Sequence, residues 1–310
     1  MNLQQFEYVL EIVRQGNHLS AAAEALHTSQ PGVSRQIRSL ERELGFAIFH
    51  RTPNRILGVT EAGAEVLKVA ERIMDCLRSL EALKQEVHAA DEGELVIATT
   101  HTHAKYLLPE IIRDFMAGHP KVRVELRQGD PESICTMVAN GLADVAIGTE
   151  AAYGDEGFIR FPSFVVTRSV LAPKGHPLLM EENLTLEHLV EYPLITYDAR
   201  YSAYTKVLGA FQKAGLKPHV ILSAMDADVC KAYVRSGFGI AILATVACLQ
   251  DVDESLDHRE VDHLFESSTS YIRVRPTAYI RKYLVDFIGM CTPSLDEEAI
   301  LKAVKSYQAT

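Results

Sequence analysis

Hydrophobic residues in the first 60 positions recur at helical spacing and predict three helices. Residues 3–15 carry one apolar face, and residues 20–45 divide into two helices joined by a tight turn. Ser20 is the expected N-cap of the middle helix, which continues through three alanines that favour helix. The third helix has apolar residues spaced 4, 3 and 4 apart, which predicts an inward stripe: Val33, Ile37, Leu40 and Leu44.

The start of the third helix is polar and basic on the face opposite this stripe. Thr28 and Ser29 offer capping hydroxyls, Pro31 fits the first turn, and Gly45 is placed to end the helix. The opposite face carries Gln30, Ser34, Arg35 and Arg38. A helix, a tight turn and a basic second helix predict a DNA reader, in which Ser20, Thr28 and Ser29 also contact DNA. A small helical bundle with a solvated basic face is the alternative.

Residues 46–60 predict a wing beside this reader. Two short apolar strands flank Pro53 and Asn54, and Arg51 and Arg55 lie close to that turn. Such a hairpin suits contact with DNA phosphates, and it favours the DNA-binding interpretation over a plain bundle.

Residues 60–89 predict one long helix with a heptad seam. The apolar positions are spaced 3, 4, 3, 4, 3 and 4 apart: Val66, Val69, Ile73, Cys76, Leu80, Leu83 and Val87. At ~1.5 Å per residue the helix is roughly 44 Å long. We expect it to join two subunits, so that two reading helices reach successive major grooves. A helix packed on its own domain is the alternative.

Beyond residue 90 the pattern changes to strands alternating with helices. Residues 94–100 and 143–149 are short apolar runs, typical of parallel strands buried on both faces. Two consecutive series of this kind predict two α/β lobes with a cleft between them. We expect the chain to cross between the lobes near residues 162 and 268, and the tail to return to the first lobe.

Polar residues at predicted strand ends mark candidate ligand positions. Three segments lie at such strand ends: 99–103, 149–150 and 197–202. Asp226 and Ala227 open a further helix, whose free N–H groups are expected to face the cleft. Hydroxyls and helix N-termini suit a small anion. Threonines before helices are most often simple caps, so the prediction depends on their convergence at the cleft.

Composition narrows the function. The net charge is −10, yet residues 1–60 hold six Arg and no Lys against five Glu, which is +1 and leaves −11 for the remainder. The five cysteines are scattered, which indicates neither a zinc site nor a disulfide framework. No nucleophile elbow, Walker motif or Rossmann glycine run is present, so no enzyme activity and no cofactor are expected. Without a signal peptide or an apolar run of about 18 residues, we expect a cytoplasmic protein without membrane contact.

The motifs together resemble the LysR-type transcriptional regulators. AAAEALHTSQPGVSRQIRSLERELGFAIFHR at 21–51, followed by VTEAG at 59–63, carries the resemblance to the family. Four later segments resemble its CysB branch, regulators of cysteine synthesis and sulfur assimilation: ATTHTHAKYLLP (98–109), ADVAIGTEA (143–151), YPLITY (192–197) and DADVCKAYVRSGFGIAI (226–242). The resemblance implies an all-α winged helix-turn-helix and a linker helix, followed by an α/β two-lobed periplasmic-binding-protein-like domain. It also implies that Thr100, Thr102 and Thr149 line the effector site.

Several residues depart from the branch pattern. His103 stands where glutamine is usual, Asp198 and Ser202 where threonines are usual, and Met225 where threonine precedes the turn. A carboxylate at Asp198 repels an anion unless it points away or pairs with Arg200 or Lys105, and a protonated His103 would compensate. An effector with an amine that Asp198 binds is therefore an alternative to acetylserine or sulfate-like effectors. With Ala227, these residues complete the candidate effector site, and an HxH metal pair at His101 and His103 is a remote alternative.

The predicted organisation is a winged helix-turn-helix at 1–59, a dimerising helix at 60–89 and an effector domain at 90–310. Within that domain, lobe I spans 94–162 and 268–310, and lobe II spans 163–267. The predicted function is control of cysteine-biosynthesis and sulfur-assimilation promoters in response to a small metabolite, as a homodimer that pairs into a homotetramer and contacts RNA polymerase. Regulation of sulfonate use or amino-acid metabolism is one alternative, and an αβ solute-binding protein that does not bind DNA is the other.

Overall fold

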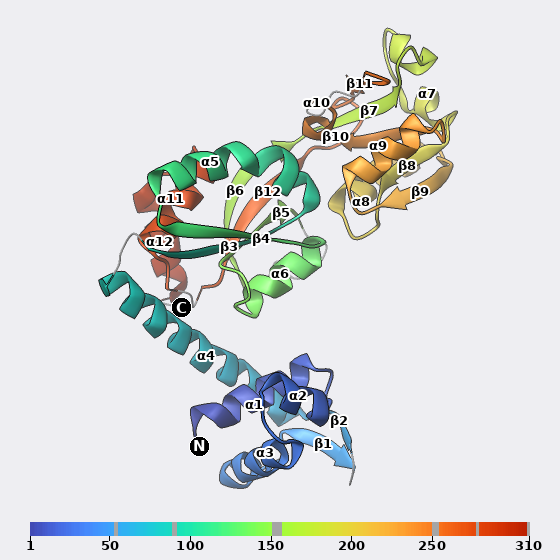
Figure 1. Ribbon diagram of the computed structural model, residues 1–310. Helices are drawn as coiled ribbons and strands as arrows, with labels where there is room; N and C mark the ends of the chain where they lie inside the picture. Colours follow the sequence, from blue (N-terminus) through green and yellow to red (C-terminus); the bar gives the residue numbers. More distant parts are fainter. Residues whose placement is uncertain (53–54, 89–91, 151–156, 250–253, 277–278, 309–310) are drawn as a thin grey trace. The chain divides into compact units, whose positions relative to one another are not determined.

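A computed structural model describes residues 1–52, 55–88, 92–150, 157–249, 254–276 and 279–308. The chain forms two compact units, one made mainly of Met1–Lys84 and the other mainly of Gln85–Thr310. Figure 1 shows the elements of each unit.

The first unit is a three-helix head with a hairpin. Its elements are α1 (Leu3–Arg14), α2 (Leu19–Ala25), α3 (Gln30–Leu44), β1 (Phe49–Thr52) and β2 (Arg55–Val59). The antiparallel strands confirm the predicted wing, although its Pro53-Asn54 turn lies outside the described residues. The core contains most of the predicted apolar stripe together with residues of the neighbouring helices: Val9, Ile12, Ala22, Val33, Ile37 and Leu40.

The helix ends of the head match the predictions in part. Ser29 caps α3 through a bond from the Gly32 N–H to its hydroxyl at 3.3 Å, and Gly45 ends that helix with a φ of 80°. The prediction that Ser20 caps α2 is wrong, because α2 starts two residues earlier, with His18 as its N-cap and no side-chain bond there. A start at Leu19 places that apolar residue against the core, which outweighs the capping hydroxyl.

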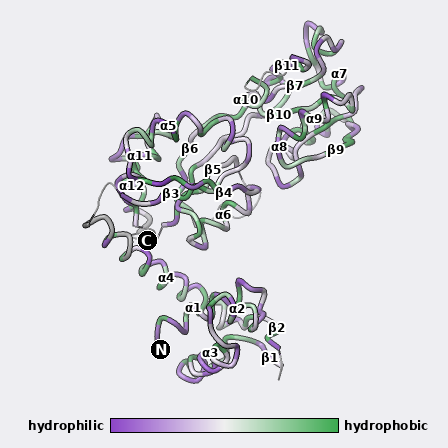
Figure 2. The backbone as a smooth tube through the Cα atoms, viewed as in Figure 1, coloured by the Kyte–Doolittle hydropathy of each residue, from purple (hydrophilic) through white to green (hydrophobic). Residues whose placement is uncertain are grey.

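The long helix α4 (Glu61–His88) follows the wing directly. Thr60 caps its start, since its hydroxyl accepts the Gly63 N–H at 2.8 Å and donates to the Ala47 carbonyl. A Cβ at Gly63 would lie 2.1 Å from the Ile48 carbonyl oxygen, so only glycine permits this close approach. Figure 2 shows apolar and polar residues alternating along α4.

The first lobe of the larger unit is a five-stranded sheet in the order β4-β3-β5-β12-β6. Its strands are β3 (Gly93–Thr99), β4 (Val122–Gln128), β5 (Val145–Thr149), β6 (Ile159–Val166) and β12 (Ser268–Val274). Strand β3 pairs in parallel with β4 and β5, whereas β12 runs antiparallel to β5 and β6. The carboxyl ends of β3 and β5 therefore meet at one edge of the sheet.

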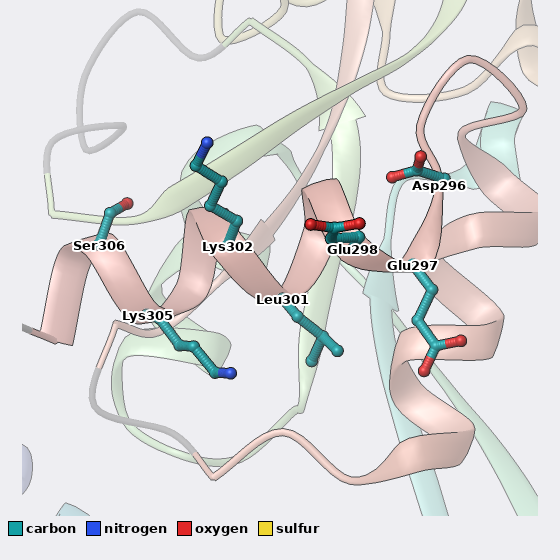
Figure 3. A pocket seen from close by; sticks show the side chains of 7 residues that line it. All are labelled: Asp296, Glu297, Glu298, Leu301, Lys302, Lys305 and Ser306. Carbon is teal, nitrogen blue, oxygen red and sulfur yellow. The ribbon is translucent and has the colours of Figure 1, made fainter.

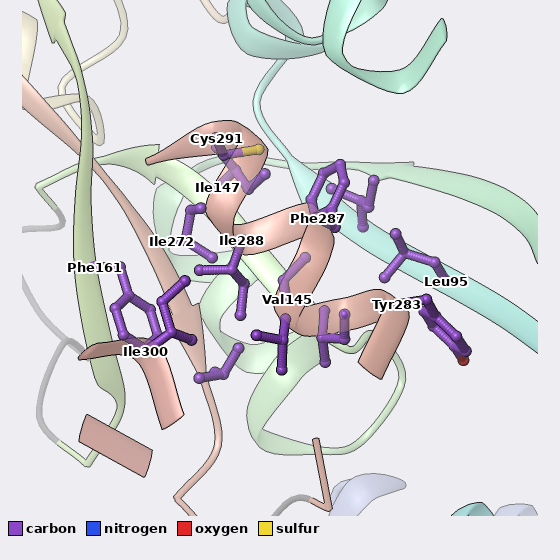
Figure 4. Packing of buried hydrophobic residues seen from close by; sticks show 14 of the residues in the cluster. Leu95, Val145, Ile147, Phe161, Ile272, Tyr283, Phe287, Ile288, Cys291 and Ile300 are labelled. Carbon is purple, nitrogen blue, oxygen red and sulfur yellow. The ribbon is translucent and has the colours of Figure 1, made fainter. Parts of the chain in front are cut away.

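Helices cover both faces of this sheet (Figure 1). α5 (Leu108–Gly118), α11 (Lys282–Cys291) and α12 (Glu297–Gln308) pack on one face, and α6 (Pro131–Ala139) packs on the other. Figure 4 shows Phe287 and Ile288 of α11 against the strand residues. The tail helices α11 and α12 thus pack on the first lobe, and α12 itself was not predicted.

The second lobe repeats the pattern with the strand order β11-β7-β10-β8-β9. Its strands are β7 (Arg168–Pro173), β8 (Leu194–Tyr197), β9 (Val220–Ala224), β10 (Ile240–Ala244) and β11 (Leu256–Glu260). α9 (Ala227–Arg235) and α10 (Thr245–Leu249) pack on one face. α7 (Leu186–Val190), α8 (Ser202–Lys213) and the 3₁₀ turn η2 (Pro177–Met180) pack on the other.

The lobe boundary differs from the predicted one. β6 stays in the first sheet as far as Val166, where it pairs with Ser268, and β7 begins the second lobe at Arg168. The crossing predicted near residue 162 is therefore too early. The apolar run from 164 to 173 reads as one strand in the sequence, but it is divided between two sheets at Thr167.

Candidate effector site

The candidate site begins where β3 ends and the chain turns into a helix. Thr99 and Thr100 are buried, and residues 103–107 then form a π-helical turn, η1 (His103–Leu107), before α5. π-turns are rare and recur at functional sites. This turn directs the His103 side chain into the protein interior and the Lys105 side chain towards the surface.

A cavity of about 40 Å³ lies beside this turn. Four predicted site residues line it: Thr100, Thr102, His103 and Thr149. The ends of β3 and β5 thus bring together threonines that are about 50 residues apart in sequence. The volume admits a few waters or a small anion and is well below that of pockets for drug-sized ligands.

His103 lines this cavity and is almost fully buried. Its Nδ1 lies 2.7 Å from the Thr100 hydroxyl, and its Nε2 is hydrogen-bonded to the Ser270 hydroxyl. Burial, with a smaller contribution from the Arg273 guanidinium, lowers the pKa of His103 to about 4. The expectation that a protonated His103 offsets a nearby carboxylate is therefore wrong, because the ring is neutral at pH 7.

The buried neutral ring makes the stability of the protein depend on pH. The pKa of His103 is lower in the folded state than its ordinary value near 6.5. Its stabilising contribution is thus fully present above pH 6.5 and is lost as the pH falls towards 4. Between pH 7.5 and 5, the free energy of unfolding should therefore fall by about 2 kcal/mol less in His103→Gln than in the wild type.

Urea unfolding at the two pH values measures this difference. His219→Gln, at an exposed position of the second lobe, is the matched control and should keep the wild-type pH dependence. Equal pH dependence in wild type and His103→Gln would contradict a neutral buried imidazole.

The remaining predicted site residues, Asp198, Ser202 and Ala227, do not line the cavity. Ser202, at the start of α8, donates to the Thr149 hydroxyl at 3.1 Å. Asp198 accepts from Arg200 Nε at 2.8 Å, and this hydrogen bond holds the pKa of the Asp198 carboxyl below its usual value. Ala227 is fully buried in the core under α9. The Asp198 carboxylate is therefore paired with Arg200, which is one of the two arrangements in which it would not repel a bound anion.

Seven wall residues are absent from the predicted effector set, although Tyr197 and Tyr201 lie within the candidate segment 197–202: Val166, Arg168, Tyr197, Tyr201, Ala203, Ala244 and Ser268. Two of them offer strong donors. Arg168 is 3% exposed and Tyr197 is 5% exposed. Arg168 is the only charged residue in the apolar run from 164 to 173. A single charge in such a run is the sequence feature that could have identified Arg168 as a candidate.

A polar cluster on Asp228 joins the two lobes beside this cavity. Asp228 Oδ2 accepts from Lys105 Nζ at 2.9 Å and lies 2.8 Å from His101 Nε2, while Oδ1 accepts from the Tyr106 hydroxyl at 2.6 Å. Burial alone would raise the pKa of Asp228, but these hydrogen bonds hold it well below its usual value.

The same cluster bears on the HxH metal alternative. His103 turns inward, so His101 instead meets Asp226 and Asp228. The Asp228 carboxylate is already bonded to Lys105 and Tyr106, which disfavours a cation there.

A second hollow, of about 790 Å³, lies along α12 and has a different character. Figure 3 shows its side chains, which all come from α12 and the turn before it. Acids at the helix start and Lys302 and Lys305 further on mix both charges there. None of these residues was predicted as a ligand position at a strand end, and the cavity at the ends of β3 and β5 remains the better candidate.

None of the helices that the structure describes combines the length and the hydrophobicity that a membrane span needs.

The reading face of α3 is open to solvent in the head. Gln30, Arg35 and Arg38 are exposed, and Ser34 is half-buried. Ser20, Thr28 and Ser29 are exposed as well.

The two arginines of the wing differ in their surroundings. Arg51 Nη2 donates to Glu41 Oε2 at 2.9 Å, and Glu41 Oε1 also accepts from the Ile48 and Phe49 N–H groups. Arg51 therefore anchors the hairpin to α3, whereas Arg55 is exposed and available for a phosphate contact.

The heptad seam of α4 is largely uncovered in the single chain. Leu80 is 62% exposed, Val69 is 49% exposed and Leu83 is 41% exposed. The side chain of Val87 lies outside the described residues, as does Ala89 at the predicted end of the helix. An apolar row of this kind at heptad spacing suits a second helix.

A helix-turn-helix head, a long helix and a two-lobed domain with a polar cavity define a ligand-responsive DNA-binding protein. Residues 3–64 match the bacterial regulatory helix-turn-helix protein family of the lysR type, and residues 88–296 match the LysR substrate binding domain. The chain belongs to the LysR family of DNA-binding transcription regulators.

Similar proteins place it in the CysB-like branch of that family. The chain is 44% identical to the HTH-type transcriptional regulator SsuR of Burkholderia cenocepacia, over 97% of each chain. It is 41% identical to the regulator CysB of the same organism, over 98% of this chain and 97% of that protein. It is 40% identical to the regulator cbl of Escherichia coli, over 98% and 96%.

Solved structures agree with this fold. The cofactor-binding domain of the Cbl transcriptional regulator matches with a TM-score of 0.66 at 38% identity, over 69% of this chain and 93% of that one. CbnR in complex with its target DNA matches with a TM-score of 0.62 at 22% identity, over 95% and 100%, a likeness of fold alone.

Proposed function

We propose that this chain controls sulfur-assimilation genes, those for cysteine synthesis or for the use of sulfonates, in response to a metabolite bound in the cavity at the ends of β3 and β5. The observation that carries the proposal is the convergence of Thr100, Thr102 and Thr149 on one small cavity. Relatives named CysB, cbl and SsuR support the pathway. The effector is a small anion such as sulfate, or an acetylated amino acid whose carboxylate enters the cavity.

The amine-bearing effector has less support than the anion. Its motivation was a free carboxylate at Asp198, but that group is paired with Arg200, which in turn donates from Nη1 to Asp130 Oδ2 at 2.9 Å. The described wall residues include Arg168 and no Asp or Glu.

Regulation would act through a shift between two arrangements of the subunits. The uncovered seam of α4 pairs two chains, and dimers pair into a tetramer on promoter DNA in the cytoplasm, where RNA polymerase is a further partner. Effector binding favours one arrangement of the lobes, and only differential affinity for the two arrangements drives the change. The spacing of the heads on DNA changes as a result.

Promoter binding tests the pathway. Gel shifts with promoters of cysteine-synthesis and sulfonate-use genes from the same genome should show retardation, which acetylserine or sulfate alters, whereas an unrelated promoter should not bind. Equal binding to all promoters would contradict the assignment.

Thr102→Val tests the cavity separately from the DNA head. The variant keeps the side-chain shape but loses the hydroxyl, so effector affinity should fall roughly 10-fold while DNA affinity stays unchanged. Isothermal titration and gel shifts measure the two affinities, and Thr136→Val, at an exposed position of α6, is the matched control. Unchanged effector affinity in Thr102→Val would contradict the site.

A further inference from the structure

The wall of the effector cavity contains a buried guanidinium. Arg168 opens β7 and lines the cavity together with the three threonines. Only 3% of the residue is exposed. A charge so far removed from water is costly unless hydrogen bonds or a counterion compensate it.

The bonds of this guanidinium leave one edge open. Nη1 donates to the Glu266 carbonyl, and Nη2 donates to the Ser268 hydroxyl at 2.8 Å. The Nε–H is buried and has no hydrogen-bond partner among the described residues. A guanidinium offers parallel donors along its edge, and that geometry matches two oxygens of one oxyanion.

A second unpaired donor lies in the same wall. The Tyr197 hydroxyl, at the end of β8, is buried; the Thr102 side chain and the Ala244 backbone lie close to its oxygen, but its O–H has no acceptor in the part of the chain described here. Buried polar groups without partners are rare in folded proteins, and each one requires an explanation. Two in a single small cavity indicate that a bound molecule completes their hydrogen bonding.

We propose, building on the effector assignment above, that Arg168 and Tyr197 are the specificity residues of this cavity and that they select a sulfate, sulfonate or carboxylate group. Arg168 donates to one oxygen through Nε, Tyr197 donates to another, and the threonine hydroxyls complete the shell. The wall contains no Asp or Glu among the described residues that would repel such a group. The volume of about 40 Å³ accommodates the anionic group of a ligand.

Neutral isosteres are rejected by the same logic. A ligand without the negative oxygens leaves the Arg168 Nε–H without an acceptor, and a site built for hydrogen bonding discriminates strongly against an analogue that lacks the partner. Charge and hydrogen bonding therefore decide selectivity more than size does.

Isothermal titration of the full-length protein tests the proposal with methanesulfonate, sulfate and the neutral dimethyl sulfone, at ionic strength held constant with chloride. Wild type should bind methanesulfonate at least about 100-fold more tightly than dimethyl sulfone. Arg168→Lys keeps the charge but loses the planar edge, and it should weaken methanesulfonate binding at least 10-fold. Arg113→Gln, at an exposed position of α5, is the control and should bind as wild type does.

Tyr197→Phe provides a test that does not depend on the folding of the Arg168 variant. Among the described residues its O–H has no acceptor, so the unfolding temperature without ligand should fall little. Methanesulfonate affinity should fall about 5- to 10-fold. Equal binding of dimethyl sulfone and methanesulfonate, or unchanged affinity in both variants, would overturn the proposal.

Thr102→Val distinguishes the assignment of the effector site from the proposal about its specificity residues. If this variant weakens ligand binding while the Arg168 and Tyr197 variants do not, the cavity is the effector site and the specificity proposal fails. If all three variants bind as wild type does, the effector assignment fails with it.

Discussion

Arg35→Ala is expected to weaken specific promoter binding roughly 10- to 100-fold, equivalent to about 1–3 kcal/mol. Arg35 is exposed near the start of α3, and the amino-terminal residues of a reading helix reach the base edges. Fluorescence anisotropy with the promoter and with a scrambled duplex gives both affinities. The loss should be much larger on the promoter, because a base contact contributes only where its base is present.

Arg42→Ala is the matched control for this prediction. Arg42 is exposed on the same helix, in its last turn, seven residues beyond Arg35. It carries the same charge but lies about 10 Å further along the helix axis. An equal loss in both variants, or a loss that is the same on both duplexes, would assign Arg35 to general electrostatic attraction.

Charges introduced into the α4 seam are expected to cause a larger loss. Leu80→Lys with Leu83→Lys places two cations in the proposed helix–helix contact, where their burial is unfavourable. The protein should become monomeric, and promoter affinity should fall about 100-fold or more, because linked heads gain about 10²–10⁴ from joint binding. Sedimentation velocity reports the assembly, and anisotropy reports the affinity.

Two lysines introduced elsewhere on α4 distinguish the effect of added charge from the effect of its position in the seam. Glu65→Lys and Glu71→Lys change exposed residues off the seam and should leave the assembly unchanged. Since both Leu80 and Leu83 are exposed in the single chain, the seam variant should retain its fold and its circular dichroism. A dimer that survives the seam substitutions would move the subunit contact to another surface.

The spacing of apolar residues was sufficient to predict the elements that depend only on neighbouring residues in the sequence. The 4, 3, 4 spacing of Val33, Ile37, Leu40 and Leu44 predicted α3, and the first three are fully buried. The heptad spacing predicted α4, and the strand-end rule brought Thr100 and Thr149 to one cavity. In these cases periodicity and chain direction determine which residues meet.

Other features depend on contacts between distant segments. His103 is neutral because burial and the neighbouring Arg273 disfavour its proton, and the sequence around residue 103 contains neither cause. Arg168 and Ser268 line the cavity because the chain crosses between the lobes twice at nearly the same place. A run of apolar residues cannot indicate that it changes sheets at Thr167, so the lobe boundary was placed too early.

Binding of the full-length chain to sulfur-assimilation promoter DNA at low salt, with and without sulfate or acetylserine, tests the central claim most directly. We expect full-length protein to retard a promoter fragment with dyad symmetry, and the effector to change the complex. A chain that lacks residues 1–60 should not bind the fragment. A full-length protein that ignores every duplex at low salt, or that binds equally well without its first 60 residues, would contradict the account.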